Sequence, residues 1–205
     1  MNAIPEAQSR GNVPTGWPLV GWCSFGVLAV TAAVLAADGT GETGLRAVVR
    51  ASALTSLLLF TAAFTASAAH KVWRTPLSRW MLANRRYLGV SFAVSHAVHL
   101  IAIVRLARAV PDFTPNTTTL VFGGVGYVVL AAMTATSFDR TAAWLGPRAW
   151  KRLHTFGVHY LWFIFFASYV PRLSLSPVYA LHTAVLVAAL ALRLVARRAR
   201  TSAAR

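Results

Sequence analysis

Six apolar segments, each long enough to cross a membrane as a helix, constrain this chain more than any other feature of its sequence. The segments are Trp17–Ala37, Ala47–Ala69, Tyr87–Val110, Leu120–Phe138, Leu153–Val170 and Val178–Leu194. A helix needs about 20 mainly apolar residues to cross a hydrocarbon layer about 30 Å thick. Inside that layer a segment must satisfy its own backbone hydrogen bonds, which favours helices over a sheet. The sequence therefore predicts an all-α integral membrane bundle of six transmembrane helices in contact with membrane lipid.

The composition narrows the class of protein further. Hydrophobic residues make up 57% of the 205-residue chain, charged residues make up 12%, and the mean hydropathy is +0.57. These values exclude an ordinary water-soluble domain. The net charge of +15 comes from basic residues between the apolar segments, so we assign it to membrane topology and expect no nucleic-acid partner. Cys23 is the only cysteine, which excludes an internal disulfide, an iron–sulfur cluster and a thiolate zinc site.

Basic residues indicate the side of the membrane on which each connection lies. Residues 70–86 carry Lys71, Arg74, Arg79, Arg85 and Arg86, and residues 138–152 carry Arg140, Arg148, Lys151 and Arg152. Because cytoplasmic loops are enriched in Lys and Arg, we predict that both connections and both termini are cytoplasmic. The chain would then be a multi-pass protein of the inner (plasma) membrane. It divides into a polar N-terminal segment (1–16), a six-helix domain (17–194) and a basic cytoplasmic tail (195–205).

Four histidines inside the apolar segments are candidate ligands of a cofactor. At about 1.5 Å per residue, His96 and His99 lie about 15 and 20 Å into the third predicted helix. By the same count, His154 and His159 lie about 3 and 10 Å into the fifth. His96 and His99 share one helix face, whereas residues five apart, such as His154 and His159, point about 140° away from each other. Ionisable groups are costly in a membrane, so several of them indicate a functional site.

Neutral imidazoles in a bundle that lacks thiolates favour haem as the cofactor. Haem iron accepts one axial imidazole from each of two facing helices, and the apolar porphyrin suits a helical bundle. Zinc would require ligands clustered at one depth, whereas these side chains are spread along two helices. Hydrogen bonds between helices and a path for protons are the two other interpretations that the histidines allow. We assign His96, His99, His154 and His159 as candidate haem and iron ligands, and no residue as catalytic.

Two sequence motifs resemble a known family. The first is Arg85-Arg86-x-Leu-Gly, followed by His99 fourteen residues after Arg85. The second is Trp150-Lys-Arg-Leu-His154, preceded by "AAMTATSFDRTAAWLGPRA". On these motifs, residues 47–198 resemble the ferric-reductase-like transmembrane domain family. The similarity is greatest to its short bacterial members, such as the haem-binding membrane subunit of the periplasmic methionine-sulfoxide reductase system.

The resemblance implies transmembrane electron transfer through one haem b, or two, held between the third and fifth helices. It implies a haem-binding oxidoreductase membrane subunit or electron-transfer component. The electron donor would be a separate flavoprotein or a quinol, so that a flavin or a quinone enters through a partner. The acceptor would lie outside the membrane and could be a periplasmic protein.

The chain departs from the family pattern at the usual position of a second ligand. The family places a histidine thirteen residues after the Leu-His position, and here that position is Ala167. We prefer His96 with His159 as the ligand pair, because it keeps the ligands on the third and fifth helices. These two are also the closest in estimated depth among the midmembrane candidates. His99 with His182 of the sixth helix is the other possible pair.

His70 and His154 both lie at the cytoplasmic edge of the predicted bundle. There they could hold a second haem or take no part in binding. Two further functions compete with electron transfer. One is a non-redox membrane binding or structural protein that has lost the full ligand set, and the other is a small proton-coupled transporter.

Overall fold

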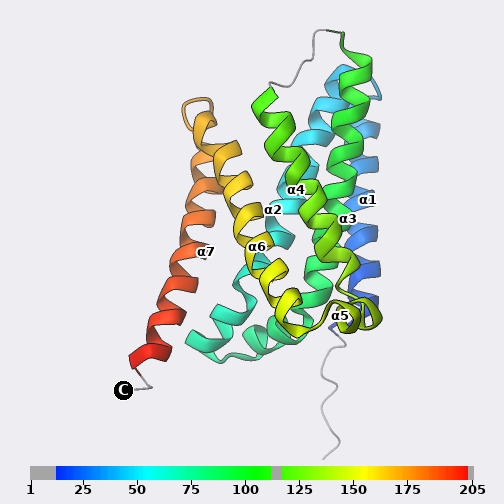
Figure 1. The fold of residues 1–205 in the computed structure, drawn as a ribbon. Helices are drawn as coiled ribbons and strands as arrows, with labels where there is room; N and C mark the ends of the chain where they lie inside the picture. Colours follow the sequence, from blue (N-terminus) through cyan, green and yellow to red (C-terminus); the bar gives the residue numbers. More distant parts are fainter. Residues whose placement is uncertain (1–12, 112–116, 203–205) are drawn as a thin grey trace, which may run out of the picture.

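The chain folds as an all-helical bundle, and a computed structural model describes its residues 13–111 and 117–202 (Figure 1). The helices are α1 (Trp17–Asp38), α2 (Glu42–Trp73), α3 (Pro76–Ala109), α4 (Thr117–Ala135), α5 (Asp139–Leu145), α6 (Pro147–Tyr169), the 3-10 turn η1 (Val170–Arg172) and α7 (Pro177–Ser202). Within the described ranges there is no strand. Six helices are long and apolar enough to cross a membrane, which confirms the predicted spans. Most of the predicted N-terminal segment (1–16) lies outside the described residues, as do residues 112–116.

Helices α2 and α3 extend well beyond their predicted apolar segments. They contain 32 and 34 residues, so at 1.5 Å per residue each is about 50 Å long and exceeds the hydrocarbon thickness. The connection predicted over residues 70–86 is therefore almost entirely helical. Only Arg74, in the left-handed conformation, and Thr75 interrupt it. Thr75 is the N-cap of α3, because its hydroxyl accepts a hydrogen bond from the Ser78 backbone N–H. Pro76 is the first residue of α3, a position that proline favours.

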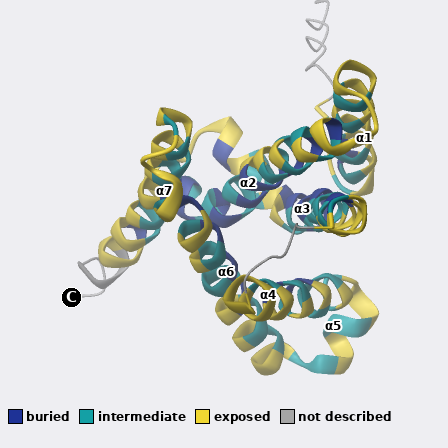
Figure 2. Ribbon diagram, turned by 90° about the horizontal axis from the view of Figure 1, so that it is seen from above, coloured by how far each residue is buried: buried dark blue, intermediate teal, exposed yellow. Residues whose placement is uncertain are grey.

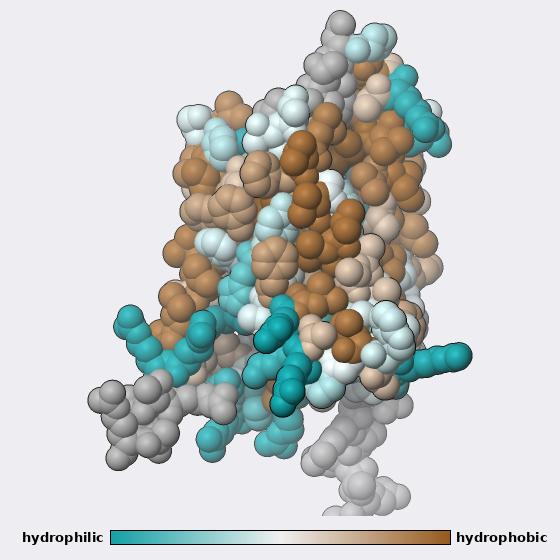
Figure 3. Space-filling model, viewed as in Figure 1, coloured by the Kyte–Doolittle hydropathy of each residue, from teal (hydrophilic) through white to brown (hydrophobic). Residues whose placement is uncertain are grey.

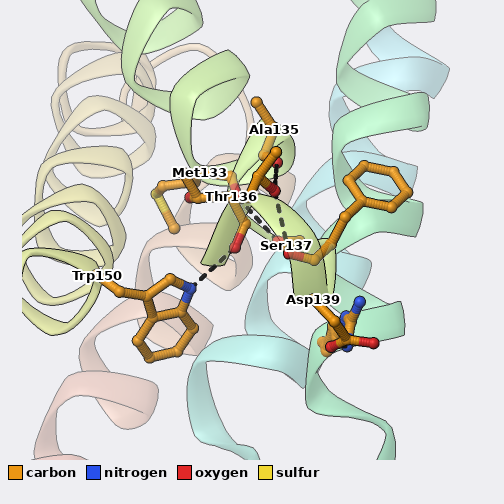
Figure 4. A network of polar contacts seen from close by, with 9 residues as sticks. Met133, Ala135, Thr136, Ser137, Asp139 and Trp150 are labelled. Atoms are coloured by element: carbon orange, nitrogen blue, oxygen red, sulfur yellow. Dashed lines mark hydrogen bonds and ion pairs between the residues drawn. The ribbon is translucent and has the colours of Figure 1, made fainter. Parts of the chain in front are cut away.

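The short helix α5, which is too short to cross a membrane, joins α4 to α6 (Figure 1). Figure 4 shows the polar contacts between the end of α4 and the start of α6. A side chain just after α4 stabilises the last turn of this helix, because the Ser137 hydroxyl donates to the Met133 carbonyl at 2.8 Å. The indole of Trp150 on α6 donates to the Thr136 carbonyl at 2.9 Å. Gly146, with φ of 77°, lets the chain turn directly from α5 into α6. Together these contacts hold the start of α6 against the end of α4.

The membrane-spanning helices form two groups (Figures 1 and 2), and an aromatic core lies between these groups. Helices α1, α2 and α3 pack against one another, α4 packs on α6, and α7 lies against both α2 and α6. Between the groups lie the buried side chains of Phe60 and Phe64 from α2, Phe92 from α3, and Phe165 and Tyr169 from α6. This core is the environment in which the candidate histidines lie.

The two ends of the bundle differ in charge. One end, here called the basic end, is formed by the ends of α2, α4 and α7 and the starts of α3 and α6. Hydrophilic residues gather at this end, below an apolar face (Figure 3). Two backbone contacts fasten the start of the described chain to this end: the Trp80 indole donates to the Pro14 carbonyl at 3.1 Å, and the Gly16 amide donates to Asn84 Oδ1 at 2.9 Å. The opposite end, at the turns from α1 to α2 and from α6 to α7, is called the far end.

Candidate functional site

The two histidines of α3 form a stacked pair in the middle of the bundle. The ring centroids of His96 and His99 are 5.3 Å apart and their planes differ by 20°, in agreement with the shared helix face that their spacing predicts. His96 also stacks on the phenol ring of Tyr127 from α4, with centroids 4.8 Å apart. Its ring lies 5.7 Å from that of Phe165 on α6. His96 therefore faces both α4 and α6.

Hydrogen bonds to α2 orient the ring of His99. Its Nδ1 lies 3.0 Å from the Ser52 hydroxyl oxygen and 3.1 Å from the Val49 carbonyl oxygen. The Ser52 hydroxyl donates its own proton to the Val48 carbonyl at 2.6 Å, and a carbonyl can only accept. The neutral His99 ring therefore carries its proton on Nδ1, and Nε2 keeps a lone pair. That is the arrangement usual for a histidine that binds a metal through Nε2.

A row of hydroxyl groups lies beside this pair and joins α2 to α3. The Ser95 hydroxyl is 2.8 Å from that of Thr55 and 3.0 Å from that of Ser56. Ser56 and Ser95 are fully buried, and Ser52 is buried one turn away. Small hydroxyl side chains let two helices approach closely and bond across their interface within a membrane. The row therefore fixes the position of the α3 pair relative to α2.

His96 differs from its neighbour because its ring nitrogens have no hydrogen-bond partner among the residues that the structure describes. Its Nδ1 is also completely removed from the surface. Buried polar atoms in folded proteins are nearly always paired, and an unpaired one in a low-dielectric interior is costly. An imidazole left in this state is suited to bind something that the protein itself does not supply.

The two candidate histidines of α6 lie in different environments, as their five-residue spacing predicts. His159 donates from Nδ1 to the Thr155 carbonyl at 2.7 Å, which leaves Nε2 with a lone pair. Its ring lies nearly perpendicular to that of Phe64, with centroids 5.9 Å apart. His154 instead stacks on Trp150 at 4.1 Å and places Nε2 3.1 Å from the Thr136 hydroxyl. His154 thus belongs to the contact between α4 and α6, and His159 to that between α6 and α2.

The structure brings His96 and His99 together but separates them from His159. No ring contact or hydrogen bond joins His159 to either one in the described part of the chain. The rings of Phe64, Phe60 and Phe165 connect them in series at successive centroid distances of 5.3 and 5.2 Å. His96 contacts Phe165, which follows His159 by six residues and so lies about 9 Å further along α6.

His182 and His70 lie away from this centre. His182 on α7 is 4.9 Å from the ring of Tyr169, and its Nδ1 is buried without a partner among the described atoms. His70 at the end of α2 places Nδ1 3.2 Å from the Ser78 hydroxyl on α3. His182 thus shares the unsatisfied state of His96, whereas His70 has a structural role at the basic end.

Ala167, where the resemblance would place a second ligand, does not face the α3 pair. It lines a groove of about 600 Å³ between α4 and α6, together with Phe122, Phe163, Ser168 and Arg172 among others. No histidine is among the residues that line this groove. A histidine at position 167 would therefore point into the groove.

Three residues that contact the candidate site were not predicted from the sequence. They are Ser52 and Tyr127, which hold the α3 pair, and Arg193 of α7, whose guanidinium lies 4.3 Å from the centre of the Phe64 ring. Arg193 was detectable as an arginine within the sixth apolar segment, because charged residues inside a span are rare. Ser52 and Tyr127 carry no such signal, since hydroxyl-bearing residues are common in membrane helices.

The available donors suit an iron porphyrin better than a bare metal ion. Among residues 13–111 and 117–202 no group of three or more His, Cys, Asp or Glu side chains is placed to hold a metal ion. A porphyrin supplies four of its own nitrogens, so the protein need add only axial imidazoles with free Nε2 atoms. His99 and His159 hold their rings in that state, and His96 has no competing hydrogen bond.

Comparisons with known proteins return no match. No family model, no curated protein and no solved structure is significantly similar to this chain.

Proposed function

We propose that this membrane protein transfers electrons across the bilayer through haem b held between α3 and α6. The buried, unpaired imidazole of His96 in the aromatic core carries the proposal. His159, with Nδ1 bonded to a backbone carbonyl, is the α6 counterpart. The resemblance to the ferric-reductase-like transmembrane domain family, drawn from the motifs around Arg85 and His154, points to the same function.

The side chains of the membrane-spanning helices suit haem binding. The membrane-spanning helices offer imidazoles and aromatic rings but, in the described residues, no carboxylate near the α3 pair. Bound haem would supply one-electron chemistry, tuned by its axial imidazoles and its apolar surroundings. Phe60, Phe92 and Phe165 fill the space between α3 and α6, so these rings would move apart to admit a porphyrin.

The protein's own groups have defined tasks in this proposal. His96 and His159 would hold the haem iron once the rings between them have moved apart. His99 positions His96 through ring stacking, while Ser52 and Val49 hold His99 in place. The apolar faces of the bundle exclude water. His154 and His70 lie toward the basic end, where they are available to a second haem or serve the contacts already described.

The basic end would face the cytoplasm, and both termini would lie there, because positively charged residues favour that side of an inner membrane. A separate flavoprotein or a quinol would deliver electrons, and an acceptor beyond the far end, such as a periplasmic protein, would take them. A basic surface suits an acidic protein donor.

Proteoliposomes provide a direct test of electron transfer. Cytochrome c is sealed inside vesicles that contain the haem-loaded protein, and a membrane-impermeant reductant is added outside. The proposal predicts reduction of the sealed cytochrome c by the wild-type protein, and reduction at the rate of protein-free vesicles by the His159→Ala variant. Equal rates for wild type, variant and empty vesicles would contradict the proposed function.

A structural membrane protein without a redox role is the competing function. The filled aromatic core and the hydroxyl row between α2 and α3 form a complete interhelical packing, which favours this alternative. The two functions predict different absorption spectra. Protein expressed with added haem should show a haem b spectrum if it transfers electrons, and none if it is a structural protein.

A further inference from the structure

Arg193 is an arginine within a membrane-spanning segment, where a charged side chain is costly. It is the seventeenth residue of α7, so it lies about 24 Å along that helix from its start at the far end. Its side chain is half-buried between α7 and α2. Arginines near helix ends commonly extend toward the headgroups, but this guanidinium contacts protein instead.

The contacts of Arg193 fix the guanidinium over one aromatic ring. Nη1 donates to the Phe64 carbonyl at 2.7 Å, and Cζ lies 4.3 Å from the centre of the Phe64 ring. Phe64 is almost completely buried, so the guanidinium lies against the core. A guanidinium has five N–H donors, and only one of them has an acceptor among the described residues.

No acidic side chain balances this charge in the described part of the chain. Of the three described acids, Glu42 pairs with Arg46, Asp139 pairs with Arg86, and Asp38 ends α1 at the far end. A guanidinium in low-dielectric surroundings strongly favours an oxyanion partner, because charge-assisted hydrogen bonds to oxyanions are among the strongest in proteins. The described residues therefore supply no counter-charge for Arg193.

We infer that Arg193 forms, with Phe64 and His159, a binding site for the oxyanion of an amphipathic molecule. The guanidinium lies over the Phe64 ring, and the His159 ring contacts Phe64 at an interplanar angle of 77°. An occupant would place its oxyanion on the free N–H groups of Arg193 and its apolar part along α2, α6 and α7. Two molecules share this chemistry: a carboxylate-bearing porphyrin, which rests on the proposed function, and an anionic phospholipid, which does not.

Matched pairs of probes test the site and separate the two sources. The porphyrin arm compares haemin, with two free carboxylates, with its uncharged dimethyl ester by visible-light titration of the purified protein. The lipid arm compares phosphatidylglycerol with a neutral diglucosyl lipid by native mass spectrometry. Each arm uses wild type, Arg193→Gln, Arg193→Lys and the control Arg198→Gln, which removes an exposed charge from the same helix.

In at least one arm, wild type and Arg198→Gln should bind the anionic probe about tenfold more tightly than the neutral one. Arg193→Gln should bring that ratio close to one, and Arg193→Lys should retain part of it, because lysine keeps the charge without the planar fork. The arm in which the ratio falls identifies the oxyanion as carboxylate or phosphate.

Three results separate failure of this inference from failure of haem binding. A wild-type protein that prefers the anionic probe in neither arm would overturn the inference, and this holds even if Arg193→Gln does not fold. Equal preference in wild type and Arg193→Gln would overturn it as well. Binding of neither porphyrin, with an Arg193-dependent lipid preference, would contradict the proposed function and support the inference.

Discussion

The imidazole of His96 on α3 lies flat against the phenol ring of Tyr127 on α4, with centroids 4.8 Å apart and planes 23° apart. The Tyr127 hydroxyl also donates to the His96 backbone carbonyl at 3.3 Å. This pair is a contact between α3 and α4, which otherwise share few. It therefore joins the candidate ligand to the second helix group.

Replacing Tyr127 should separate its two contributions. Tyr127→Leu removes the stacked ring and should destabilise the protein by about 0.5–1.5 kcal/mol, the value of an aromatic pair beyond its buried area. Tyr127→Phe keeps the ring and removes only a long hydrogen bond, so it should cost about 0.6 kcal/mol or less. Thermal unfolding in detergent, followed by fluorescence-detected size exclusion, measures both. Equal losses for the two variants would show that stacking contributes nothing.

Ser95 should contribute more to stability than an equally buried serine of the same helix. The Ser95 hydroxyl reaches Thr55 and Ser56 on α2, whereas the Ser91 hydroxyl donates only to the Tyr87 carbonyl within α3. Ser95→Ala leaves two hydroxyls with a lost partner and should cost about 1–2 kcal/mol. Ser91→Ala is the matched control and should change the melting temperature little. A larger loss in the control would contradict the role assigned to the hydroxyl row.

A side chain at position 157 should destabilise the contact between α6 and α4. A Cβ at this position would lie 2.1 Å from Met133 Sδ and 3.0 Å from Val129 Cγ1. Gly157→Ala should therefore cost about 1–3 kcal/mol, as expected for overpacking. Gly126 on α4 faces the same interface, but its Cβ would meet its nearest neighbours at 3.8 Å, an ordinary contact. Gly126→Ala should be tolerated, and a thermal shift of equal size in both variants would contradict this packing.

The sequence predicted the spans well because a membrane imposes a length and a polarity that single segments display. The ends of the helices were less predictable. Residues 70–86 carry many charges and were expected to form a connection, but α2 and α3 continue through them apart from Arg74 and Thr75. Charge indicates contact with water, which a helix that protrudes from the bilayer satisfies as well as a loop. Helix α5 has only seven residues, so a criterion based on membrane-spanning length does not predict it.

The candidate site was predictable within each helix and not between helices. Helical periodicity correctly placed His96 and His99 on one face, because it depends only on local geometry. The position of His159 relative to this pair depends on packing between distant segments. His159 contacts Phe64 of α2, whereas His96 contacts Phe165 of α6. Arg193 and Phe64 are 129 residues apart, and nothing local indicates that they meet.

Haem content of purified single-histidine variants tests the central claim most directly. After expression with added haem, the wild-type protein should give a dithionite-reduced haem b spectrum in about stoichiometric amount, with the low-spin signature of two axial imidazoles. His96→Ala and His159→Ala should each lose that haem, because each removes one of the two iron ligands. His70→Ala and His182→Ala are the controls and should retain it. A colourless wild-type protein, or full haem retention in His96→Ala or His159→Ala, would contradict the account.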